Sequence, residues 1–180
     1  AALSVLDRAR AMYHVALTEL DLADPQEQDT ERWLSICRRL ALVSVFDGAR
    51  ADLPVFERGV ARARALGDPL LVAHAEHSLG YVLYALGESA ACITHIEHAM
   101  QAAGSGTDPL AVQIRATLGQ AKAAAADYAG AYPLLQEAVS ILATLLARFR
   151  FSPVPGREPK PVMILTLRPQ GGVWLKVEGV

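Results

Sequence analysis

The sequence contains two pairs of histidines whose spacing is that of metal ligands on a helix. His74 and His77 stand three residues apart, and so do His95 and His98. Residues three apart share one face of a helix, so the two pairs together could offer four ring nitrogens to a zinc ion. The first pair is expected on the exposed side of its helix, whereas the second flanks Ile96, which is expected to be buried. The pairs should therefore face different ways, and we predict no metal site.

The other reactive residues form no catalytic motif. Cys37 and Cys92 lie far apart, each within an apolar helical pattern and without a CxxC step, which predicts buried free thiols. The carboxylates between residues 21 and 29 are placed to cap helices. The chain has no GxxxxGK[ST], GxSxG or HExxH string. We therefore predict a chain that is not itself an enzyme and that binds no cofactor.

A stripe of polar and aromatic residues is a better candidate for a binding site. His74, His77, Tyr81 and Tyr84 follow one another at steps of three, four and three, which places them on one helix face. Thirty-nine residues further on, the corresponding places include two glutamines. Tyrosine supplies contact area and a hydrogen bond at low entropic cost. The stripe is thus a candidate partner-binding surface, comprising His74, His77, Tyr81, Tyr84, Gln113 and Gln120; alternatively, the tyrosine rings pack between neighbouring helices.

Composition narrows the class of protein. Of the 180 residues, 52% are hydrophobic but only 6% are aromatic, so the apolar content is mostly alanine, leucine and valine, which suits closely packed helices. A formal net charge of −2 leaves no electrostatic basis for nucleic-acid binding. No apolar stretch approaches the about 20 residues that cross a bilayer, and no signal peptide is recognisable. These features predict a cytoplasmic protein; because it begins with Ala, we also expect a piece of a longer chain.

Helical periodicity dominates the first 150 residues. Apolar residues recur at intervals of three and four, interrupted by short Gly, Asp and Pro breaks. The pattern predicts seven helices joined by short connections, which is typical of an antiparallel all-α array. Their expected ranges are about 3–22, 30–46, 52–66, 69–86, 89–103, 108–126 and 128–149.

Landmarks within this region recur. Asp68-Pro69-Leu70 returns forty residues later as Asp108-Pro109-Leu110, and Leu79-Gly80 returns as Leu118-Gly119. A small-large-small pattern follows each Leu-Gly pair, in which small residues let facing helices pack closely and a large one fills the groove. Its members are Cys92, Ile96 and Ala99, then Ala131, Leu135 and Ala138.

These residues resemble the tetratricopeptide repeat. Over residues 1–139 the Ala-rich helices and long GDPLL-type connections are similar to those in the repeat regions of large bacterial signalling regulators, including some adenylate cyclases. The resemblance implies a solenoid of antiparallel helix pairs whose concave groove binds a protein or a peptide. Self-association of the chain is an open alternative.

Beyond residue 151 the pattern changes. The string SPVPGREPKP has four prolines in ten residues and cannot continue a helix. MILTLRP and GGVWLKV then alternate in the manner of two strands, which predicts a hairpin about a Pro-Gln-Gly-Gly turn. Residues 140–180 are therefore expected to form a second part of the chain, with Leu145, Leu146 and Phe149 buried against the array or the hairpin.

The tail has a resemblance of its own. The ordered run from Gln136-Glu137-Ala138 through LLARFRF and Val154-Pro155-Gly156 to LTLRPQGGV looks like the C-terminal end of a bacterial cytochrome P-450, over residues 135–180. That family needs a cysteine thiolate on the haem iron, eight residues ahead of the position matched by Gln136. Here that place holds Tyr128, and the resemblance therefore implies the fold of the tail without its chemistry.

Two functions follow from these resemblances. The first is a non-catalytic protein–protein interaction module, with a scaffolding or regulatory role, from a bacterial signalling protein. The alternative is a fragment or degenerate part of a haem-thiolate monooxygenase that lacks the haem ligand.

Overall fold

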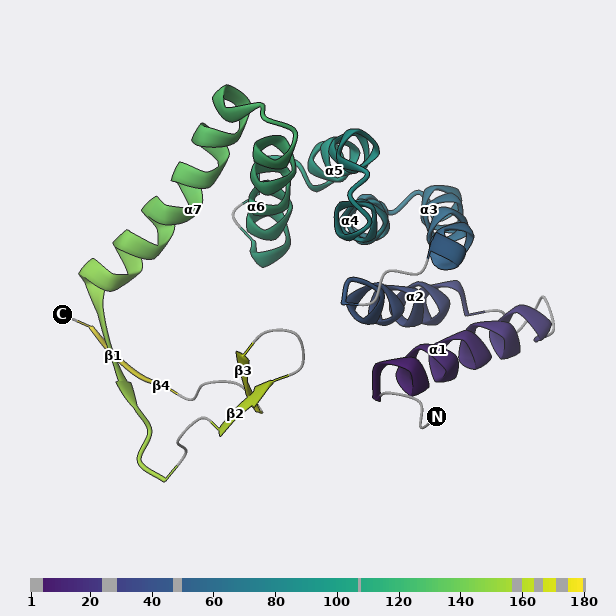
Figure 1. The fold of residues 1–180 in the computed structure, drawn as a ribbon, viewed down its shortest axis with the longest axis horizontal. Helices are drawn as coiled ribbons and strands as arrows, with labels where there is room; N and C mark the ends of the chain where they lie inside the picture. The colour runs from purple at the N-terminus through teal and green to yellow at the C-terminus, as the bar shows by residue number, and fades with distance from the viewer. Residues whose placement is uncertain are drawn as a thin grey trace. The chain divides into compact units, whose positions relative to one another are not determined.

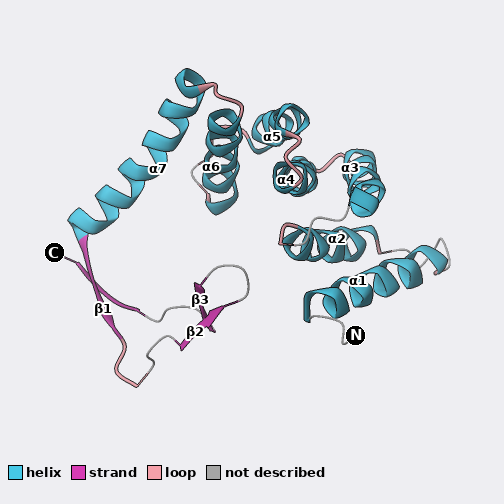
Figure 2. Ribbon diagram, viewed as in Figure 1, coloured by secondary structure: helices cyan, strands magenta, loops and turns pink. Residues whose placement is uncertain are grey.

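The computed structural model describes residues 5–23, 29–46, 50–106, 108–156, 160–163, 167–170 and 175–179. The chain divides into two compact units, Ala1–Leu135 and Gln136–Val180. Each unit is considered by itself. Figure 1 follows the chain from the N-terminal helices to the C-terminal strands, and Figure 2 shows that the described strands lie only in the C-terminal part.

The all-α class of the first part is confirmed. The described helices are α1 (Val5–Leu22), α2 (Thr30–Ser44), the short 3₁₀ helix η1 (Arg50–Asp52), α3 (Leu53–Leu66), α4 (Pro69–Ala85), α5 (Ser89–Ala103), α6 (Pro109–Ala124) and α7 (Tyr128–Arg148). These ranges agree with the helical periodicity to within about two residues at most ends, which is the usual uncertainty of helix boundaries. Within the described residues, no helix is both long enough and apolar enough to cross a membrane.

The Asp-Pro-Leu landmarks begin helices. The Asp68 side chain accepts hydrogen bonds from the backbone N–H groups of Leu70 and Leu71, and Pro69 occupies the first turn of α4. Asp108 begins α6 in the same manner. A capping carboxylate pairs backbone donors that the helix leaves free, and proline suits the first turn because it lacks a donor. The repeated motif is therefore a repeated helix start.

Within the first unit, the even-numbered helices form one series, in which α2 packs on α4 and α4 packs on α6. The helices between them pack on both neighbours: α3 contacts α2 and α4, and α5 contacts α4 and α6. The interface between α4 and α5 is the most extensive. The buried core runs through all of them. Its largest fully buried apolar side chains are Trp33, Leu40, Phe56, Leu79, Val82, Cys92, Ile96, Ile114 and Leu118.

The Leu-Gly landmarks mark close approaches between helices. A Cβ atom placed on Gly80 would lie 2.6 Å from Cδ1 of Ile96 on α5, and one placed on Gly119 would lie 2.8 Å from Cδ2 of Leu135 on α7. Neither separation is compatible with a side chain in the present packing. Glycine at these two positions lets the large residue of the following helix fill the space, as the small-large-small pattern predicts.

Replacing Gly80 with valine is expected to lower the free energy of unfolding by about 1 to 3 kcal/mol, because the new side chain must displace Ile96 from a site with no free space. Urea denaturation followed by circular dichroism measures the loss. The double variant Gly80→Val/Ile96→Ala serves as the control, since it removes the clashing atoms. Its loss should be less than the sum of the two single losses, and strict additivity would contradict the close contact.

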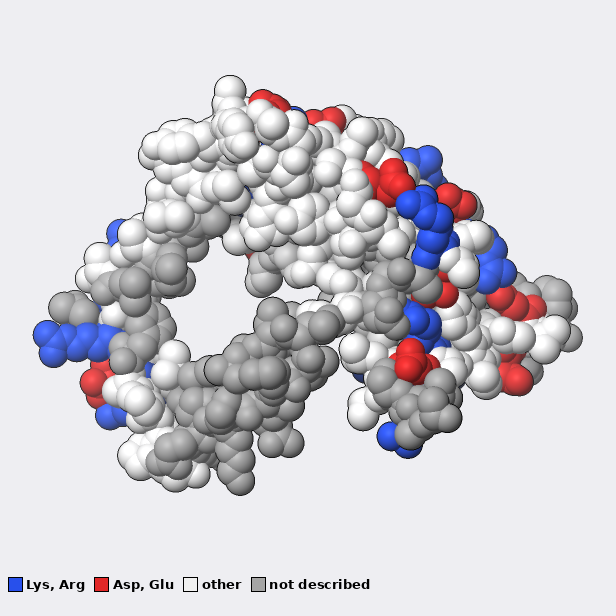
Figure 3. Space-filling model, in the orientation of Figure 1, with Lys and Arg blue, Asp and Glu red and all other residues white. Residues whose placement is uncertain are grey.

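Carboxylates connect α1 to the helices that follow. Asp52 is 5% exposed and accepts hydrogen bonds from Ser44 Oγ at 3.2 Å and from His14 Nε2 at 2.9 Å. Asp21 accepts from Arg62 at 2.6 Å. Within the first unit, the charged side chains visible in Figure 3 gather mostly over the N-terminal helices, whereas the face over α6 shows almost none. Polar contacts thus supplement a small core at the N-terminal end, where Leu17 is the buried residue of α1.

The predicted pairing of the tail strands is wrong. β3 (Leu167–Gln170) pairs antiparallel with β2 (Lys160–Met163), and β4 (Leu175–Gly179) pairs antiparallel with β1 (Phe149–Pro153). The expected turn residues Pro169 and Gln170 thus belong to a strand. The sequence did not predict β1. Phe149 was expected to end the last helix and Phe151 to follow it directly, although aromatic residues at alternate positions favour a strand.

The expected burial of three residues near the end of α7 has a mixed outcome. Phe149 begins β1 and is 37% exposed, so the prediction that it is buried is wrong. The side chains of Leu145 and Leu146 lie outside the described residues.

Candidate functional site

The predicted stripe separates into buried and accessible members. His77 is only 7% exposed, and its Nε2 lies 3.2 Å from Oγ1 of Thr117 on α6. The Thr117 hydroxyl donates its proton to the carbonyl of Gln113 at 2.9 Å, so His77 must be the donor of the bond between them. The His77 ring also stacks on Tyr81, with centroids 5.8 Å apart. His77 therefore joins α4 to α6 and presents little surface to a partner.

The remaining members of the stripe are accessible to different degrees. Tyr81 and Tyr84 are half-buried, and Tyr84 packs against the core. Gln113 and Gln120 are exposed on α6. They lie four residues before and three after Thr117, and so share its face of the helix. Tyr81 and the two glutamines thus border the seam between α4 and α6 that the bond from His77 to Thr117 closes.

His74 shares this face of α4 but lies toward α2. Nη1 of Arg38 is 3.3 Å from its Nε2, and burial together with the Arg38 charge lowers the pKa of His74. His74 also lines a cavity of about 70 Å³ between α2, α3 and α4. Small-molecule sites are typically about 300–1,000 Å³, so this cavity suits a single side chain of a partner better than a ligand. Its lining includes Leu34, Arg38, Phe56, Leu71, His74 and Ser78.

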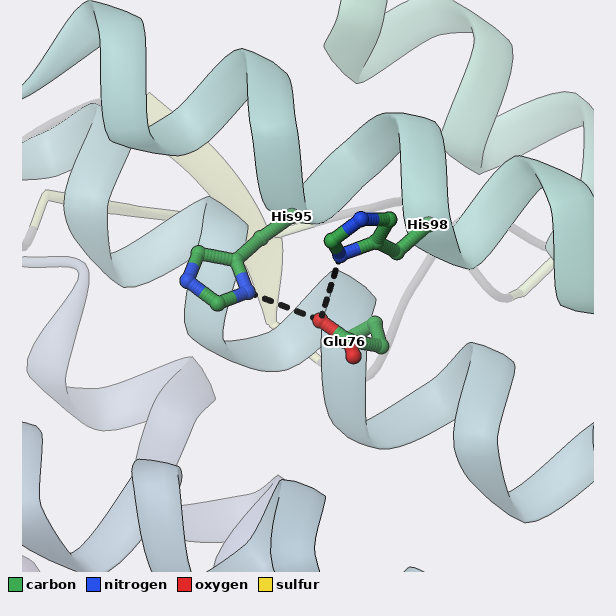
Figure 4. Close-up of side chains that lie close together, drawn as sticks. All are labelled: Glu76, His95 and His98. Carbon is green, nitrogen blue, oxygen red and sulfur yellow. Dashed lines mark hydrogen bonds and ion pairs between the residues drawn. The ribbon is translucent and has the colours of Figure 1, made fainter. Parts of the chain in front are cut away.

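A second cluster surrounds a buried carboxylate. Glu76 on α4 is 0% exposed. Its Oε1 accepts from Arg64 at 2.5 Å, and its Oε2 accepts from Nδ1 of His95 at 2.8 Å. Nδ1 of His98 lies 4.0 Å from the same Oε2. Figure 4 shows both imidazoles of α5 turned toward this oxygen.

Charge within this second cluster is balanced. Burial by itself would raise the pKa of Glu76, but the hydrogen bonds from His95 and Arg64 and the positive charge of these partners outweigh it, and the net pKa lies below the ordinary value. The carboxylate is therefore ionised and accepts both bonds. Removing one partner of such a group is costly, because an uncompensated charge then remains buried.

The four histidines do not converge on one ion in this part of the chain. His77 bonds to Thr117, His74 lies beside Arg38, and only the pair on α5 reaches the carboxylate. The expectation that the two pairs face different ways is confirmed. Glu76 is not among the residues predicted from the sequence. The available signal was helical spacing: Glu76 follows Ala73 by three residues and precedes Leu83 by seven on the buried face of α4.

Both cysteines belong to the buried core of the first unit. Cys37 and Cys92 are buried free thiols, as predicted. Burial raises the pKa of Cys37 to about 12, against the opposing charges of Arg58 and Arg62, and raises that of Cys92 to about 11. Both thiols are therefore protonated near neutral pH. Tyr128, which takes the place of the ligand in the cytochrome P-450 resemblance, is 69% exposed at the start of α7.

No protein-family model, characterised protein or solved structure matches this chain.

Proposed function

We propose that this chain is a non-catalytic protein-interaction module, built as a tetratricopeptide-like array and taking part in bacterial signalling. The proposed partner is a peptide or helix that lies across α2, α4 and α6. The observation that carries the proposal is the accessible border of the seam between α4 and α6, where Tyr81 lies beside a helix face bearing Gln113 and Gln120.

The chemistry of this border supports recognition of a polypeptide. Glutamine side chains both donate and accept hydrogen bonds, as a peptide backbone requires. Tyr81 is held in place by its stack on His77, so little of its freedom remains to be lost on binding. The α2–α4 cavity beside His74 is of a size to hold one anchoring side chain.

Buried groups support this binding surface from below. His77 does not contact the partner in this proposal; it fixes α4 against α6 through Thr117. Tyr84 packs against the core beneath this helix face. The proposed contact residues are therefore His74, Tyr81, Gln113 and Gln120, with His77 and Tyr84 as positioning residues.

Peptides selected from a displayed random library against the whole chain provide the test. The triple variant Tyr81→Ala/Gln113→Ala/Gln120→Ala is expected to bind a selected peptide at least tenfold more weakly, because a tenfold change is worth about 1.4 kcal/mol and one anchoring tyrosine often contributes more than that. Fluorescence anisotropy measures Kd. The double variant Thr94→Ala/Gln101→Ala, exposed on α5, is the matched control and should bind normally.

Unchanged affinity in the triple variant would overturn the proposed contact surface. Failure to select any peptide whose binding saturates would overturn the module itself.

A further inference from the structure

The carboxylate and the two imidazoles that meet between α4 and α5 have the composition of a metal site. Glu76, His95 and His98 each offer one ligand atom, and these three atoms all lie within 4.8 Å of one another. Two imidazoles and one carboxylate form a common set of protein ligands for zinc when a fourth position is left to water. The same set with open positions also holds other divalent transition metals.

We propose that Glu76, His95 and His98 bind a divalent transition-metal ion, with Zn²⁺ the ion that this donor set suits best. The ion would be held by Oε2 of Glu76 and by Nδ1 of each histidine, with water in the remaining position. It would connect α4 to α5 at their shared interface.

Of the two distances from Glu76 to the histidine nitrogens, one is shorter and one is longer than the separation of neighbouring ligands in a zinc site. Zn²⁺ lies about 2.0–2.2 Å from nitrogen and oxygen ligands, so neighbouring ligands of a tetrahedral site are about 3.3 Å apart. From Oε2 of Glu76, Nδ1 of His95 is 2.8 Å away and Nδ1 of His98 is 4.0 Å away. Opposite movements of about half an ångström in the two imidazoles would equalise these separations, and rotation of the side chains is sufficient for movements of that size.

His98 supplies an independent reason to expect a ligand. Its Nδ1 atom is buried, yet among the described residues it has no hydrogen-bond partner. Buried polar nitrogens are nearly always paired, and each exception calls for an explanation. The His95 and His98 rings meet edge to face with centroids 6.2 Å apart, so neither ring satisfies the other. A metal ion on the Glu76 side would use this nitrogen.

The surroundings permit both entry and orientation. The side chains of His95 and His98 are 28% and 43% exposed, which leaves a route for the ion and a place for water. Arg64 bonds to Oε1 of Glu76 and leaves Oε2 for the metal, as groups behind a metal ligand commonly do. Coordination replaces the bond from His95 to Glu76: the ion displaces the proton from Nδ1, and Nε2 of the same ring carries a proton in the bound state.

Titration of the full chain with ZnCl₂, against a chromophoric chelator as competitor, tests the proposal. One equivalent of Zn²⁺ should bind per chain, and the melting temperature should rise, because an ion that binds only the folded state stabilises it. Co²⁺ gives a second reading, since its visible absorption reports the nitrogen and oxygen ligands directly.

The variant His98→Ala is expected to bind Zn²⁺ at least tenfold more weakly and to lose the metal-dependent rise in melting temperature. This residue is the appropriate first target because its side chain is partly exposed and its removal leaves the bonds of Glu76 to Arg64 and His95 intact. His74→Ala, which removes a partly exposed histidine from the other side of α4, is the matched control and should bind as the wild type does.

Absence of stoichiometric Zn²⁺ binding to the folded chain would overturn the proposal. So would equal affinity in the wild type and His98→Ala, since the ion would then lie elsewhere. Peptide binding is tested with the triple variant of Tyr81, Gln113 and Gln120, and metal binding is tested with His98→Ala, so the two proposals can fail separately.

Discussion

Replacing Trp33 with alanine is expected to lower the free energy of unfolding by about 3 to 5 kcal/mol, the usual loss when a fully buried aromatic residue is removed. Trp33 is 0% exposed on α2. The guanidinium of Arg62 lies 4.4 Å from the ring centroid and that of Arg58 lies 5.4 Å from it. Both arginines bond to Asp21 of α1. The ring thus supports contacts among three helices, and its loss should affect all of them.

Two further variants make this measurement specific. Trp33→Phe keeps most of the buried area and removes an indole N–H that has no hydrogen-bond partner among the described residues, so it should lose less than Trp33→Ala. Leu42→Ala changes a residue of the same helix that is 54% exposed and should cost no more than about 0.5 kcal/mol. Equal losses in Trp33→Ala and Leu42→Ala, measured by urea denaturation, would show that Trp33 is not part of the core.

The second large effect concerns pH. Burial, with a smaller contribution from the charge of His74, lowers the pKa of His77 from 6.5 to about 4. Between these values the unfolded chain binds a proton at His77 that the folded chain does not, so stability rises with pH through this window. The stabilising contribution is complete above pH 6.5 and is lost as the pH falls toward 4. At about 1.4 kcal/mol for each pH unit, the loss reaches about 3 kcal/mol.

His77→Gln isolates this contribution, because glutamine can still donate a hydrogen bond toward Thr117 but does not titrate. The free energy of unfolding should fall less steeply between pH 6.5 and pH 4 in this variant than in the wild type, where the pKa of His77 lies at about 4. His74→Gln is the comparison variant from the same helix; the pKa of His74 is itself lowered and its charge adds to the shift of His77, so this variant should also flatten the profile, but less than His77→Gln does. Parallel pH profiles for the wild type and His77→Gln would contradict a buried neutral imidazole.

Local signals in the sequence predicted the helices well. Asp68-Pro69 and Asp108-Pro109 begin helices because a carboxylate cap and a proline act within one turn, without help from distant residues. The burial of Ile96 and Ala99 follows from helical periodicity in the same way. Strand pairing depends instead on which segments meet. Nothing local to Leu175–Gly179 indicates that its partner begins at Phe149.

The candidate sites were harder to predict for the same reason. His77 looks like one member of an exposed stripe until α6 is placed beside it, since its partner Thr117 is forty residues away. Glu76 is a single carboxylate on an apolar helix, and it becomes a site only when His95 and His98 of the next helix turn toward it. Each of these arrangements is set by packing between helices, which periodicity along one helix does not specify.

The sequence of helix contacts within the first unit also bears on how such a chain can change in length. The principal contacts described there join helices that are adjacent or next but one in the chain, as α4 does with α5 and with α6. Where contacts are confined to near neighbours in the chain, stability is approximately a sum of the interactions between those neighbours. A helix pair inserted or deleted by a change in the gene would disturb only the interfaces on either side of it. The number of helices in the unit could therefore change without altering the interfaces between the remaining neighbours.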